Sequence, residues 1–166
     1  MSLNSFDSER PNHPVDIVEQ LAALNDWNFD RSALDEISIA VDGKWSQYQV
    51  AFTWLPELEA LHVSTAFEFK GPESRRTQLR ELISMINEQL WVGHFDYWLK
   101  DNVIMFRHSL LLAGGSDPSG QQCEALIKLA TEACERYFQA FQFVVWAGKS
   151  ARESLDFAMF ETTGNA

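Results

Sequence analysis

"ISIAVDGKWSQYQVAFTWLPELEALHVSTAFEF", residues 37–69, contains three runs in which apolar residues alternate with small or polar ones. A period of two is typical of strands with one buried face. The turns between the runs are supplied by "DGK" (42–44) and "PELE" (56–59). Consecutive strands joined by short turns pair antiparallel, so the stretch predicts a three-stranded meander. The expected strands are 37–41, 48–55 and 61–69.

The segments outside the meander carry the 3.6-residue period of amphipathic helices. Pro14 suits the first position of one helix, and Asp117 with Pro118 is the expected start of the longest one. Ser150 followed by Glu153 forms the pattern of a capping box at the start of a last, short helix. The expected longer helices are 14–24, 75–90 and 119–143.

"LWVGHFDYWLKDNVIMFRHSLLL", residues 90–112, predicts a hairpin of strands 94–99 and 103–112. A two-residue turn at Asp101 and Asn102 is favoured, since both residue types tolerate positive φ. This register separates apolar from polar side chains and places Asp96 opposite Arg107, Phe95 opposite His108 and His94 opposite Ser109.

A three-residue turn over 100–102 is the alternative register of this hairpin. It pairs His94 with His108 and puts Asp96 beside them, as in a candidate metal site. However, it scatters the apolar face and leaves Arg107 among the core residues.

The expected fold is α+β, because helices are interleaved with hairpins and no βαβ alternation is present. Its order is α-β-β-β-α-β-β-α plus a C-terminal helix, which gives an antiparallel five-stranded sheet with flanking helices. Residues 1–12 are expected to be a disordered tail and 13–166 a single domain.

The composition excludes several classes of function. The 166 residues include 13 basic and 24 acidic ones, for a net charge of −11. Such a chain gives no field that attracts nucleic acid or an anionic membrane. It has no apolar run long enough for a membrane span and no signal-peptide layout, so we expect a cytoplasmic protein. Cys123 and Cys134 lie about 16 Å apart along one helix, too far for a disulfide, and are expected in the core.

Catalytic motifs are absent from the sequence. It contains no G-x-S-x-G, P-loop, Rossmann glycine fingerprint or C-x-x-C, and no nucleophile–base set can be assembled. We therefore expect no enzyme, no cofactor and no resident metal.

Tryptophans are enriched at sites of protein interaction, and Trp45, Trp54 and Trp98 are spread over the expected sheet. They are the candidates to line a surface for a second copy or another protein. Helices on one side of a sheet leave the other side available, and an apolar patch there needs a cover. The sequence thus favours a non-enzymatic protein-binding module that forms a homodimer and meets an unidentified protein partner. The alternative is a small-molecule or metal-binding sensor that uses the hairpin around His94, Asp96 and His108.

Three segments, "LWVGHFDYW" (90–98), "IMFRHSLLL" (104–112) and "YFQAFQFVVWAGKSARESL" (137–155), resemble the YbjN-like family of bacterial proteins. The resemblance covers about residues 14–163. It implies the fold of type III secretion chaperones, an antiparallel sheet with flanking helices. It also implies a family of sensory-transduction regulators without known enzymatic residues, so no functional residue is carried over.

Overall fold

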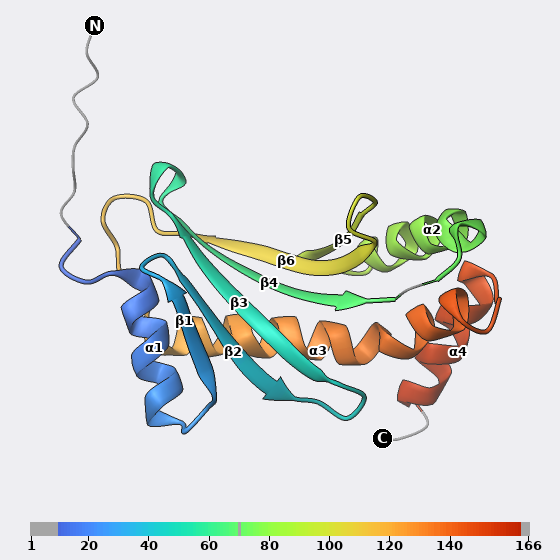
Figure 1. The fold of residues 1–166 in the computed structure, drawn as a ribbon, viewed down its shortest axis with the longest axis horizontal. Helices are drawn as coiled ribbons and strands as arrows, with labels where there is room; N and C mark the ends of the chain where they lie inside the picture. The colour runs from blue at the N-terminus through green and yellow to red at the C-terminus, as the bar shows by residue number, and fades with distance from the viewer. Residues whose placement is uncertain (1–9, 70, 164–166) are drawn as a thin grey trace, which may run out of the picture.

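The computed structural model describes residues 10–69 and 71–163, which form a six-stranded antiparallel sheet and four α-helices (Figure 1). The strands are β1 (Phe29–Ala33), β2 (Glu36–Asp42), β3 (Gln47–Leu55), β4 (Ala60–Glu68), β5 (His94–Trp98) and β6 (Val103–Leu111). The α-helices are α1 (Pro14–Leu24), α2 (Arg76–Asn87), α3 (Gly120–Val145) and α4 (Ala151–Thr163), and η1 (Pro56–Leu58) and η2 (Glu73–Arg75) are short 3-10 turns. The α+β class and every expected strand and helix are confirmed to within a few residues.

The strand order is β1-β2-β3-β4-β6-β5, with all neighbours antiparallel. The β1–β4 meander therefore meets the β5–β6 hairpin along β4 and β6. Figure 1 shows α3 running behind β2 and β3, with α1 near the β1 side of the sheet and α2 near β5. Within the described part of the chain, each helix is too short or too polar to cross a lipid bilayer.

The expected number of five strands is wrong, because β1 was missed. Its sequence, "FDRSA", lacks the apolar alternation that marks a half-buried strand. Four of its five residues are exposed, and its pairing with β2 shifts register between Asp30 and Ala33. Edge strands of this kind are held by one neighbour and a few polar contacts, which leave little trace in the hydrophobic pattern.

The core lies between one face of the sheet and the helices. Strand residues of one parity are almost completely buried there, and α3 supplies most of the opposing side chains. Cys123 and Cys134 are free and buried among them, as expected. The buried strand residues on this face are Ile37, Ile39, Tyr48, Val50, Phe52, Trp54, Leu61, Val63, Thr65, Phe95, Ile104 and Phe106.

The register of the β5–β6 hairpin differs from both expected registers. His94 pairs with Arg107, and Phe95 pairs with Phe106. The connecting segment is residues 99–102, in which Asn102 has a φ of 53°. The expected division of side chains between the two faces is nevertheless confirmed, since Phe95 and Phe106 face the core and His94 is exposed.

The start of α3 also differs from expectation. Its N-cap is Ser119, whose Oγ accepts a hydrogen bond from the Gln122 backbone N–H at 3.0 Å. The Gln122 side chain in turn accepts from the Ser119 N–H at 2.8 Å, which completes a capping box. Asp117, the expected cap, instead accepts a hydrogen bond from Asn12 at 3.1 Å. The expected cap at Ser150 is present, since its Oγ accepts from the Glu153 N–H at 3.2 Å.

Residues 1–9 of the expected disordered tail (1–12) lie outside the described residues. Its last residues are anchored. Arg10 lies 4.5 Å above the Trp54 ring, donates to the Leu112 carbonyl at 2.5 Å and pairs with Glu59 at 3.0 Å. Arg10 thus ties the chain entry to the sheet, and Asn12 ties it to the loop before α3.

Candidate functional site

The most extended surface available to a partner is the sheet face opposite the helices, which we call the open face. The strand registers place its side chains in rows across the sheet. The central row contains small groups on β2, β3 and β4 and larger polar groups on β6 and β5. Its members are Ser38, Ala51, Ser64, Arg107 and His94.

The rows on either side of the central row continue this division. One of them contains Glu36, Thr53, His62 and Ser109. On the other side of the central row, Ala66 pairs with Met105, and Met105 pairs with Asp96. Ala51 on β3 and Ser64 on β4 make the centre of the open face uncharged, although the chain as a whole carries −11.

The polar side of the open face holds four polar side chains from β4, β5 and β6, which we call the histidine–arginine cluster: His62, His94, Asp96 and Arg107. Asp96 Oδ2 lies 3.2 Å from His94 Nε2 and 3.4 Å from Arg107 Nη1. His62 lies one row away on β4, opposite Ser109. The expected Asp96–Arg107 pair is thus present, although it is diagonal rather than directly across the strands.

The electrostatics of this cluster favour neutral imidazole at His62. Burial lowers the pKa of His62, and the neighbouring charges of Arg107, His94 and His108 lower it further. Burial also lowers the pKa of His108, with a smaller effect from His94. The Nε2 atom of His62 is shielded from solvent and has no hydrogen-bond partner among the described residues.

The residues of the expected sensor site do not come together. His94 and Asp96 share the open face, but His108 follows the parity of Phe106 and points to the other face. Among residues 10–69 and 71–163, no group of three or more His, Cys, Asp and Glu side chains could hold a metal ion. The His94–His108 pairing that a metal site requires is therefore wrong for this hairpin.

The three expected surface tryptophans occupy three different environments. Trp54 is 6% exposed and lies in the core beneath Arg10, so it is not on the surface of a single chain. Trp45 is in the β2–β3 turn, where its backbone N–H donates to the Glu135 carboxylate of α3 at 3.3 Å. Trp98, at the end of β5 and 43% exposed, is the one on the open face, next to Val103.

The outer edge of β5 is occupied from within the chain. Asn87, at the end of α2, donates from Nδ2 to the Phe95 carbonyl at 3.0 Å and accepts from the Phe95 N–H at 2.9 Å. This is the pair of hydrogen bonds that a neighbouring strand would make. A groove of about 560 Å³ remains between α2 and β5, but Asn87 protects the centre of the strand edge.

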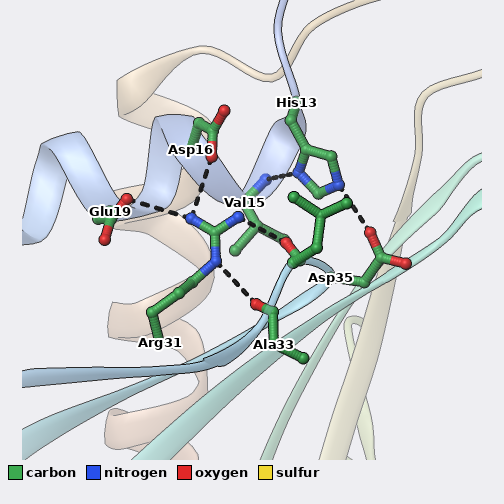
Figure 2. Close-up of polar contacts among 8 residues, drawn as sticks. His13, Val15, Asp16, Glu19, Arg31, Ala33 and Asp35 are labelled. Atoms are coloured by element: carbon green, nitrogen blue, oxygen red, sulfur yellow. Dashed lines mark hydrogen bonds and ion pairs between the residues drawn. The ribbon is translucent and has the colours of Figure 1, made fainter.

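A second polar cluster joins α1 to β1 and the following turn (Figure 2). The Arg31 guanidinium lies between Asp16 at 3.0 Å and Glu19 at 3.1 Å, and it also donates to the Ala33 carbonyl at 2.9 Å. His13 caps α1 by accepting from the Val15 N–H at 3.1 Å, and its other ring nitrogen lies 2.7 Å from Asp35. Because these groups satisfy one another, the cluster is structural: it fixes α1 on the edge of the sheet.

We expect Arg31→Met to lower the free energy of unfolding by about 1–2 kcal/mol, since Asp16, Glu19 and the carbonyls of Ala33 and Leu34 lose their donor. The value stays modest because the carboxylates are partly exposed. Arg31→Lys is the matched control: it keeps the charge but lacks the planar fork, so an intermediate loss is expected. Urea unfolding measures both, and a Met variant as stable as the natural chain would contradict the role of this cluster.

His62 is the member of the histidine–arginine cluster that sequence reasoning missed. The alternation in 61–69 placed it on the polar face of its strand, where polar residues are expected anyway. Its neighbours in space come from β6 and β5, more than 30 residues later. The signal that could have found it is the pairing of β4 with β6, which no local pattern in the sequence reveals.

Comparison with known proteins agrees with this fold. A family model described as "YbjN: Putative bacterial sensory transduction regulator" matches residues 14–143. The crystal structure of YbjN from E. coli, described as "a putative transcription regulator", matches with a TM-score of 0.53 at 12% sequence identity. That match covers 73% of this chain and 85% of that chain, and it shows the fold alone. No curated protein matches the chain by sequence.

Proposed function

Since the chain belongs to the YbjN family, a family of bacterial regulators, we propose that it is a non-catalytic regulator that works through protein–protein contacts. The first of these contacts is a homodimer formed through the open face of the sheet. The observation that carries the proposal is that α1 and α3 cover the other face of the sheet while α2 lies beside β5, which leaves the open face without a covering α-helix among the described residues. The expected likeness to type III secretion chaperones, which are protein-binding, agrees with it and stays a prediction.

A second copy suits this surface because of charge. Two chains of net charge −11 repel each other, so they associate best through the face that carries the fewest acidic groups. In the central row, Ser38, Ala51 and Ser64 bring no charge at all. Small side chains also allow two sheets to approach closely, and a two-fold axis lets one surface serve both partners.

Trp98 gives this surface a candidate anchor. It stands at the rim of the open face, half-exposed beside Val103. Aromatic residues of this kind carry a large share of binding energy when a partner covers them. Its contribution is expected in the dimer rather than in the folding of a single chain.

Light scattering at micromolar concentration tests the proposal. We expect a mass of about twice the 19.0 kDa chain, and we expect Trp98→Ser to weaken the dimer at least about tenfold. Trp91→Ser is the matched control, since Trp91 is 99% exposed in the loop before β5 and should leave the dimer unchanged. A monomeric natural chain, or equal effects of the two substitutions, would count against the proposal.

A further inference from the structure

The histidine–arginine cluster has the composition of an anion site. We propose that Arg107 and His62, with Ser64, Ser109 and His94 around them, bind a small oxyanion, either a phosphate or a carboxylate group. The site lies on the open face and therefore deepens the proposed function by giving the regulator a ligand. It does not require the dimer, and its test is read from individual histidines rather than from molecular mass.

Strand pairing brings the donors to one spot. Arg107 is the common neighbour, since Ser64 on β4 and His94 on β5 are both its direct cross-strand partners. His62 and Ser109 form the next pair along the same two strands. Side chains opposite each other in a sheet are about 5 Å apart at Cβ, and the diagonal neighbours are within reach of long side chains. One oxyanion can therefore be reached from β4, β5 and β6 together.

The present partner of Arg107 is a weak one. Its Nη1 meets Asp96 at 3.4 Å, and Asp96 is also shared with His94. A guanidinium forms shorter, paired hydrogen bonds with an oxyanion that presents two oxygens. Asp96 thus acts as an internal competitor, which a ligand must displace from Arg107.

His62 supplies a second reason for a ligand here. Its Nε2 atom is shielded from solvent and unpartnered among the described residues, and such an atom favours an incoming hydrogen-bond partner. Thr53 on β3 and Ser109 on β6 are its cross-strand neighbours and bring no charge. The acidic residue of the same row is Glu36, two strands away on β2.

The negative charge of the ligand is expected to change the protonation of His62. The pKa of His62 is lowered by burial and by Arg107, His94 and His108, so its ring is neutral near pH 7. A bound oxyanion brings negative charge beside the ring and favours its protonation. Binding should therefore take up a proton at His62 and strengthen as the pH falls toward the lowered pKa of that ring. Asp96 and Glu36 are the acidic groups on the same face as the site.

The test is a titration of the full chain with inorganic phosphate, and separately with succinate, at pH 6 and constant ionic strength. The imidazole C–H signals are followed by NMR. The chain has four histidines, and His13, bonded to Val15 and Asp35 at the far end of the sheet, is the internal control. We expect saturable shifts of His62 and His94, with His13 unmoved. Saturation by phosphate alone assigns a phosphate ligand, and saturation by succinate alone assigns a carboxylate.

Two substitutions sharpen the test. Arg107→Gln should weaken binding about tenfold or more, since it removes a charged donor. Asp96→Asn should tighten binding several-fold by removing the competitor, whereas Asp30→Asn, an equal change of charge on β1, should not. The proposal is overturned if neither anion gives saturable shifts, if chloride gives the same shifts, or if Asp96→Asn and Asp30→Asn behave alike.

Discussion

Replacing Phe95 by alanine is expected to lower the free energy of unfolding by about 3–5 kcal/mol. Phe95 is 1% exposed, and its ring packs against Phe106 at 5.3 Å, Phe141 at 5.3 Å and Tyr137 at 6.0 Å. These neighbours lie on β6 and α3, so one side chain holds the edge strand β5 to both. Since domains of this kind are stable by about 5–15 kcal/mol, the loss would be a large part of the total.

Trp98→Ala is the control for Phe95→Ala, because Trp98 lies on the same strand but on the open face. In a single chain its removal is expected to change stability by about 0.5 kcal/mol or less. Urea unfolding at low concentration, where the chain is monomeric, measures both variants. Comparable losses for the two would show that the helix-covered face is not the one that holds β5 in place.

Gly93→Ala is expected to be the second strongly destabilising change. Gly93 has a φ of 75°, and an added Cβ would lie 2.3 Å from Cζ of Phe106, a ring that is completely buried. The left-handed conformation costs a residue with a Cβ about 1–2 kcal/mol. The collision with Phe106 adds a further loss of about 1–3 kcal/mol, as in overpacked cores.

Gly114→Ala separates the two contributions. Gly114 has a φ of 81°, but an added Cβ there meets no atom within 4 Å. This variant should therefore lose the backbone contribution and keep the packing. Thermal unfolding of both is the measurement. Equal shifts in Tm would mean that the Phe106 ring moves aside at little cost, and would contradict tight packing at the start of β5.

The hairpin of β5 and β6 shows which part of a sheet a sequence determines. Alternation assigned Phe95 and Phe106 to the core and His94 to the other face, and both assignments are confirmed. The predicted register was wrong. Shifting one strand by two residues keeps every side chain on its face, so the hydrophobic pattern cannot distinguish the two registers. The difference was decided by the turn, where Asn102 takes a positive φ within a longer connection than expected.

Trp54 shows a different limit of sequence reasoning. It shares its parity with Val50 and Phe52, so alternation already placed it on the buried side of β3. Its expected role on a surface came from the general enrichment of tryptophan at interfaces. The side chain is instead covered by Arg10, from an N-terminal segment with few apolar residues and no periodicity. Polar contacts over such sequence distances leave no local pattern.

The most direct test of the open face as a dimer surface is a pair of identical substitutions on opposite sides of the molecule. Ala51 lies in the central row, flanked by Ser38 and Ser64, and Ala125 is exposed on α3. We expect Ala51→Arg to give a folded monomer by light scattering and circular dichroism, while Ala125→Arg and the natural chain stay dimeric. A monomeric natural chain, or an Ala51→Arg variant that remains a dimer, would contradict the proposal that the open face joins two copies.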